Sequence, residues 1–97
     1  MIERGSARIL VVEDDASIRL LLTTLLEREG FDIVAATDGE AALRSVVEHE
    51  PDVVVLDVGL PRLDGLEVTR RLRANRATRT LPVILLTARA SIDDMVA

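Results

Sequence analysis

The sequence predicts an α/β fold with a doubly wound parallel sheet, and three observations support this prediction. Short apolar runs alternate with segments of helical periodicity, and the connections between them are short, which is typical of parallel strands joined by helices. The run 53–56 is apolar at every position, as expected of a strand that is covered on both faces. Right-handed crossovers then restrict the topology to a doubly wound sheet.

The first half of the chain contains two predicted strands around one helix. The apolar segment 7–12 and the short alternating segment 31–35 are the strands. Residues 17–29 form the helix, and Gly30 follows where a glycine commonly ends a helix. The helix has the i, i+3, i+4, i+7, i+8 spacing of a core-facing stripe at Ile18, Leu21, Leu22, Leu25 and Leu26.

The second half repeats this pattern. A helix is predicted from a cap on Thr37 or Asp38 up to Pro51. Its apolar stripe consists of Ala41, Ala42 and Val46, with Val47 at the margin. After the central strand, a helix over 66–75 and an apolar strand over 81–88 complete the pattern.

Polar residues away from the strand ends are predicted to be solvated. The arginine-rich segment 70–79 is typical of an exposed helix face, and His49 belongs to an exposed helix end. Ser91 is predicted to cap a fourth helix.

Composition limits the classes of function. A length of 97 residues predicts a single domain, 1–97. The net charge of −5 argues against a nucleic-acid-binding surface. The absence of cysteine excludes disulfides and thiolate metal sites. Neither a signal peptide nor a membrane span is predicted, so we expect a cytoplasmic protein with no membrane partner.

Three predicted strands end in residues with functional groups. The first ends in the acidic run 13–15, the third in Asp57 and the fourth in Thr87. Because ligands of such folds lie outside the carboxyl ends of the strands, we expect these groups to converge. Neighbouring carboxylates repel one another unless they share a cation, and Mg²⁺ prefers such oxygen ligands. A carboxylate there can also attack phosphorus, with the threonine bonding a phosphoryl oxygen.

Each of these residues also has an ordinary structural interpretation. Asp14 or Asp15 alone is a common helix cap, and Asp57 alone is a turn-former before Gly59. Thr87 alone is an ordinary strand-end residue. The coincidence of matched chemistry on three strands of one sheet favours a site.

The segments "ILVVEDD", "VVVLDVGLPRLDG" and "LPVILLTAR" resemble the receiver domain of two-component response regulators. The resemblance covers nearly the whole chain, and the wording of the first and last segments is similar to the branch with winged-helix DNA-binding output domains. It implies a flavodoxin-like sheet of order 2-1-3-4. By this resemblance, we expect the chain to lack the fifth strand and fifth helix of the family, with the lysine at the end of that strand.

The resemblance also implies roles for the strand-end residues. Asp57 would accept a phosphoryl group from a histidine kinase. Glu13 and Asp14 would form the acidic pair that binds Mg²⁺, together with Asp57 and the backbone carbonyl of Gly59. Asp15 would lie outside that pair.

A second group of implied roles concerns switching. Thr87 would be the hydroxyl that moves toward the phosphoryl group, and the backbone N–H of Ala88 would lie nearby. Gly59 and Arg89 would flank the site and tune the lifetime of the phosphoryl group.

Three functions follow from these expectations. The first is a signalling receiver that catalyses only its own phosphorylation and dephosphorylation. The second is a shortened, non-switching interaction module. Its uncovered strand 83–86 would favour a homodimer or an exchange of elements between two copies. The third is a phosphohydrolase, which is disfavoured because haloacid-dehalogenase-type phosphatases have a second aspartate where this chain has Gly59. None of the three requires direct contact with nucleic acid.

Overall fold

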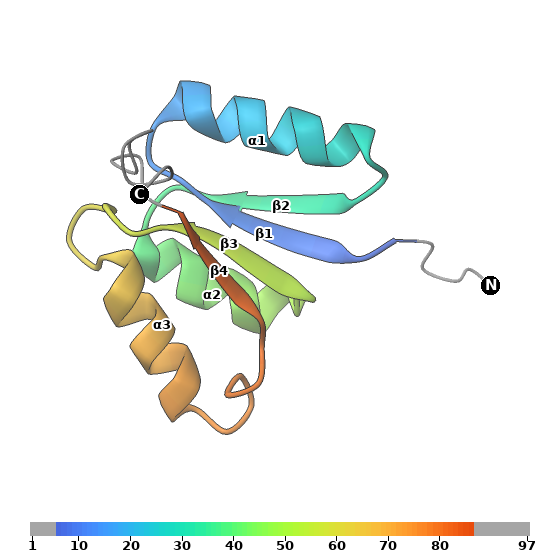
Figure 1. Ribbon diagram of the computed structural model, residues 1–97. Coiled ribbons are helices and arrows are strands. Elements are labelled where there is room, and N and C mark those ends of the chain that lie inside the picture. The colour runs from blue at the N-terminus through green and yellow to red at the C-terminus, as the bar shows by residue number, and fades with distance from the viewer. Residues whose placement is uncertain (1–5, 87–97) are drawn as a thin grey trace, which may run out of the picture.

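A computed structural model describes residues 6–86 and confirms the predicted fold class. The elements are β1 (Arg8–Val12), α1 (Ala16–Arg28), β2 (Asp32–Ala36), α2 (Gly39–His49), β3 (Val53–Asp57), α3 (Gly65–Ala74) and β4 (Val83–Leu86). The strands are parallel and lie in the order β2-β1-β3-β4. Helix α1 lies on one face of the sheet, and α2 and α3 lie on the other (Figure 1). No helix in the described part of the chain is long and apolar enough to span a membrane.

The core lies between the sheet and the helices α2 and α3. Fully buried side chains of β1 and β3 pack here against both helices. The largest fully buried side chains of this core are Leu10, Val12, Val54 and Leu56 from the strands and Val68 from α3. The burial of apolar side chains such as these is the main favourable term in folding. The central strands therefore hold their carboxyl ends in a fixed position.

The opposite face of the sheet is covered less completely, and the prediction of a core-facing stripe on α1 is wrong in part. Ile18, Leu21 and Leu25 are exposed at 37%, 57% and 46%, whereas Leu22 and Leu26 are half-buried. The reason is that α1 packs on β1 and β2, and among the described residues no second helix lies beside it. Periodicity predicted the apolar stripe correctly but did not reveal what covers it.

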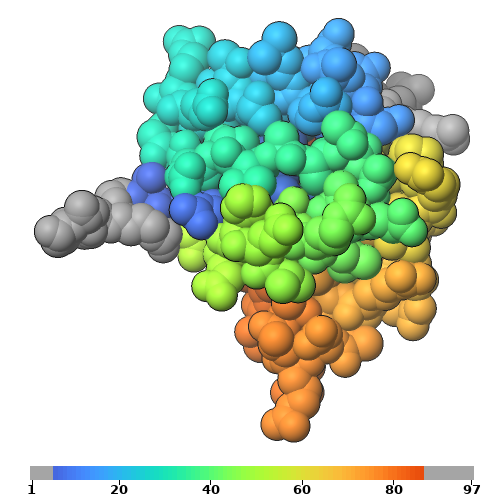
Figure 2. Space-filling model, turned by 180° about the vertical axis from the view of Figure 1, so that it is seen from behind, coloured from blue at the N-terminus to red at the C-terminus, as the bar shows by residue number. Residues whose placement is uncertain are grey.

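A second correction concerns α2. Ala42 and Val46 are buried as predicted, but the marginal residue Val47 is 76% exposed. Helix α2 contacts β1, β2 and α3, and Val47 lies outside those contact faces. Figure 2 shows α2 (green) from behind, between α1 (blue) and the α3–β4 segment (orange). Asp38 caps α2 by accepting a hydrogen bond from the Ala41 N–H at 2.8 Å, which decides between the two predicted caps.

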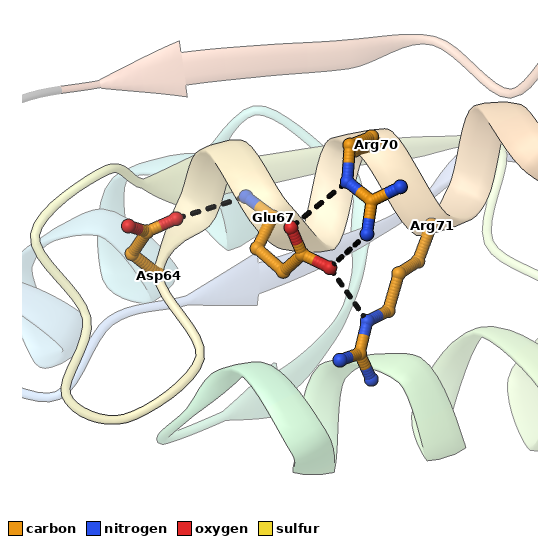
Figure 3. Close-up of polar contacts among 4 residues, drawn as sticks. All are labelled: Asp64, Glu67, Arg70 and Arg71. Atoms are coloured by element: carbon orange, nitrogen blue, oxygen red, sulfur yellow. Dashed lines mark hydrogen bonds and ion pairs between the residues drawn. The ribbon is translucent and has the colours of Figure 1, made fainter.

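Helix α3 confirms the prediction of a solvated arginine face. Glu67 in its first turn accepts hydrogen bonds from Arg70 and from Arg71, three and four residues later (Figure 3). These two guanidinium groups lower the pKa of the Glu67 carboxyl to about 2. Asp64 caps the same helix by accepting from the Glu67 N–H at 2.8 Å. Part of the positive charge is thus neutralised within the helix itself. His49 is also exposed, as the last residue of α2.

Strand β4 forms one edge of the described sheet. Ile84, Leu85 and Leu86 are exposed at 51%, 39% and 38%, so apolar side chains on both faces of this strand meet solvent. This agrees with the prediction of an apolar edge. The predicted continuation of the strand to residue 88 and the cap at Ser91 lie outside the described residues.

Candidate functional site

Asp57 is the last residue of β3 and lies at the carboxyl edge of the sheet. Its residue surface is 6% exposed, although aspartate is among the residue types that are rarely buried. Its Oδ1 atom accepts a hydrogen bond from the Gly59 N–H at 3.1 Å. The sequence left open whether Asp57 forms a turn or belongs to a site. Its position and this hydrogen bond make the two interpretations compatible.

The loop between β1 and α1 brings two more carboxylates to this edge. Glu13 is buried at 4% exposure, and its N–H donates to the Ala36 carbonyl at the end of β2 at 3.1 Å. Asp14 follows and is exposed. Asp15 accepts hydrogen bonds from the N–H groups of Ser17 and Ile18 at 2.9 and 3.0 Å, so Asp15 caps α1. The cap therefore leaves the side chain of Asp14 available for the site.

Glu13, Asp14 and Asp57 form one cluster. One carboxylate oxygen from each lies within 4.8 Å of the other two. Burial raises the pKa of the Glu13 carboxyl, and the neighbouring Asp57 and Asp14 raise it further, against the hydrogen bond from the Asp15 N–H. The causes are desolvation and like charge, which are the conditions that a bound cation relieves.

The donor set of this acidic cluster fits a hard divalent cation. All three side chains offer oxygen, and Mg²⁺ is bound in proteins through one or two carboxylates with several waters. Because Asp14 is exposed while the other two are buried, the cluster opens to solvent on one side. Solvent therefore reaches the Asp14 carboxylate.

The remaining predicted residues divide into two groups. Gly59 is placed beside Asp57 by the hydrogen bond of its N–H. Thr87, Ala88 and Arg89 lie outside the described residues, so their predicted roles stay predictions. The sequence analysis missed Arg19, whose Nη1 donates to the Glu13 carbonyl at 2.9 Å. A basic residue one turn into the helix that follows an acidic loop is the only sequence signal for it.

The model of the response regulator receiver domain matches residues 9–97, which is most of the chain. The chain belongs to this family. It is 46% identical over 92 residues to the transcriptional regulatory protein PrrA of Mycobacterium tuberculosis, covering 95% of this chain and 39% of PrrA. It is 48% identical over 82 residues to the alkaline phosphatase synthesis transcriptional regulatory protein PhoP of Bacillus subtilis, covering 84% and 33%. This receiver chain thus spans less than two-fifths of the length of these curated relatives.

Solved structures agree with the assignment. The receiver domain of the sensor histidine kinase PA1611 from Pseudomonas aeruginosa, which has a magnesium ion coordinated in its active-site cleft, superimposes with a TM-score of 0.83 at 34% identity. The alignment covers 95% of this chain and 75% of that one. The N-terminal domain of a response regulator receiver protein from Methanoculleus marisnigri gives a TM-score of 0.83 at 38% identity, covering 86% and 68%.

Proposed function

We propose that this receiver domain accepts a phosphoryl group from a histidine kinase on Asp57 in a Mg²⁺-dependent reaction. The observation that carries the proposal is the buried Asp57 carboxylate at the end of β3, within 4.8 Å of the carboxylate oxygens of Glu13 and Asp14. Mg²⁺ would be held by these three carboxylates and by the carbonyl of Gly59, with Asp14 a direct ligand and Glu13 acting through water. The ion would neutralise charge on the phosphoryl oxygens.

The residues of the chain supply the nucleophile and its orientation. A carboxylate oxygen of Asp57 attacks phosphorus, the P–N bond of the kinase phosphohistidine breaks, and its electron pair returns to the imidazole nitrogen. The Gly59 N–H orients the carboxylate by bonding Oδ1. Within residues 6–86, Oδ2 accepts no hydrogen bond, which favours it as the attacking atom. The new acyl phosphate adds about −1.5 to −2 charges, to which Thr87 and the Ala88 N–H would respond.

Labelling with acetyl phosphate tests this proposal without a cognate kinase. We expect the wild-type chain to take up label only with Mg²⁺ and to lose it in alkali, as an acyl phosphate does. Asp57→Asn should take up no label. Asp32→Asn is the matched control, because Asp32 lies at the opposite end of the sheet and is 48% exposed. Labelling of Asp57→Asn at the wild-type level would exclude Asp57 as the acceptor.

A second candidate function is self-association, favoured by the apolar edge at β4. Two copies can cover Ile84 and Leu86 by pairing along this edge or by exchanging elements. We expect sedimentation to show a mass that rises toward two chains with concentration. Ile84→Lys should return it to one chain, whereas Val47→Lys on exposed α2 should not. A well-folded wild-type monomer at high concentration would contradict this candidate.

The cellular location of the protein, its branch of the family and its partners are also part of the proposal. We infer a cytoplasmic domain that belongs to the DNA-binding branch of response regulators, because PrrA and PhoP are both transcriptional regulatory proteins. Its own contacts would be with a kinase rather than with nucleic acid, because its net charge is −5 and the arginines of α3 are partly neutralised by Glu67.

A further inference from the structure

Arg19 connects helix α1 to the acidic loop that precedes it. Its guanidinium Nη1 donates to the carbonyl of Glu13 at 2.9 Å and, more weakly, to the carbonyl of Asp14 at 3.5 Å. Its own backbone N–H donates to the Asp15 carbonyl at 2.9 Å. The half-buried Arg19 side chain therefore contacts the carbonyls of Glu13 and Asp14, whereas the Asp15 contact is the ordinary first backbone hydrogen bond of α1.

Arg73 likewise donates to main-chain carbonyls, in the segment after α3, whereas Arg19 donates to those of the acidic loop. Arg70 and Arg71 bond a carboxylate of their own helix, whereas Arg19 reaches five and six residues back to main-chain oxygens. Both contacts are made by the one nitrogen Nη1, whose N–H groups are held in the plane of the guanidinium. The result is a fixed direction for the backbone from which the Glu13 and Asp14 side chains project.

The loop needs such a restraint because its side chains repel one another. Three carboxylates lie within 4.8 Å, and each can reduce the repulsion if the loop moves away from Asp57. The Glu13 N–H bond to Ala36 and the Asp15 N–H bond to Glu13 Oε2 at 3.0 Å hold the start of the loop. Asp14 is exposed, so the contact of Arg19 with its carbonyl restrains a part of the loop that these two hydrogen bonds do not hold.

We propose that Arg19 is a positioning residue for the acidic site. By clamping the carbonyls of Glu13 and Asp14, it keeps both carboxylates directed at Asp57 and thereby sets the affinity for Mg²⁺. The inference rests on the proposed function, because it concerns the metal and phosphoryl chemistry of the same cluster. It differs from a charge effect, because it depends on the planar Nη1 group that reaches both carbonyls as well as on the positive charge.

Mg²⁺ titration of the full chain, followed by amide chemical shifts, tests the inference. We expect Arg19→Gln to weaken Mg²⁺ binding about tenfold or more, as is typical when a supporting contact of a metal ligand is lost. We also expect faster hydrogen exchange of the Asp15 N–H in the metal-free variant, a change that does not depend on activity. Arg28→Gln is the matched control, because Arg28 lies exposed in the last turn of the same helix.

Arg19→Lys separates the clamp from the charge and serves as the second variant if Arg19→Gln does not fold. Lysine keeps the charge but lacks the planar guanidinium whose Nη1 reaches both carbonyls, so we expect an affinity between those of Arg19→Gln and wild type. Wild-type affinity in Arg19→Gln, or in Arg19→Lys, would overturn the inference. A wild-type chain that binds no Mg²⁺ would instead contradict the proposed function, so the two failures are distinguishable.

Discussion

Replacing Asp14 by asparagine is expected to stabilise the metal-free protein and to remove most of the stabilisation that Mg²⁺ provides. In the metal-free state Asp14 lies within 4.8 Å of two other carboxylates, and the repulsion between two charges at such a distance costs about 1 kcal/mol even in water. The melting temperature without Mg²⁺ should therefore rise. The gain occurs because the cluster is built for a cation rather than for stability.

The same substitution should weaken the response to Mg²⁺. An ion present at a hundred times its dissociation constant stabilises the native state by about 2.7 kcal/mol. If losing the Asp14 carboxylate weakens binding about 10- to 100-fold, as loss of a supporting contact alone can do, only about 0.4–1.4 kcal/mol remains at that concentration. Thermal unfolding with and without Mg²⁺ measures both quantities.

Asp32→Asn provides the control for this pair of effects. It removes an exposed ion pair with Arg8, which contributes about 0–1 kcal/mol, so the metal-free protein should become slightly less stable or stay unchanged. Its Mg²⁺ response should equal that of wild type. A lower metal-free melting temperature for Asp14→Asn, or an undiminished Mg²⁺ response, would contradict the assignment of Asp14 to the acidic cluster.

The convergence of the acidic residues was predictable from the sequence because it depends on topology. Parallel strands place their carboxyl ends at one edge, so residues that follow two such strands must meet there. Glu13 and Asp57 follow β1 and β3, which are neighbours in the sheet. Residue type alone did not decide which of the two adjacent aspartates caps α1, although the resemblance to receiver domains placed Asp15 outside the acidic pair. Asp14 and Asp15 are chemically identical, and only the backbone direction of the loop assigns the cap to Asp15.

The sequence could not predict contacts that leave no periodic pattern in the order of the residues. The stripe on α1 is apolar by pattern, yet Leu21 and Leu25 are exposed because coverage depends on neighbouring elements rather than on the helix itself. Likewise, a bond from the Arg19 guanidinium to the Glu13 carbonyl depends on rotamer and loop geometry, which no spacing rule encodes. Sequence patterns thus predicted which carboxylates meet at the sheet edge, and the structure showed which contacts hold them there.

Replacing Gly65 by alanine is expected to destabilise the protein by about 1–3 kcal/mol, which is typical of overpacking in a filled site. Helix propensity alone would predict a gain of about 1 kcal/mol, because Gly65 is the first residue of α3. The space available for a Cβ atom decides whether the substitution stabilises or destabilises the protein. A Cβ atom at this position would lie 2.6 Å from the Asp57 carbonyl oxygen and 2.8 Å from the Val58 Cα, both main-chain atoms that cannot rotate away.

The same clash would act on the acidic cluster, since it presses on the backbone of Asp57 and Val58. Gly65 also donates its N–H to the Val58 carbonyl at 3.0 Å, so the start of α3 supports the turn after β3 directly. Gly59→Ala is the matched control, because its Cβ would meet only the Asp57 Oδ1 at 3.9 Å, an ordinary contact. Urea unfolding should show a lower midpoint for Gly65→Ala and a change within about 0.5 kcal/mol for Gly59→Ala. Equal stability of the two variants would mean that α3 can move away from β3 without cost, and the close approach that positions Asp57 would then have no energetic role.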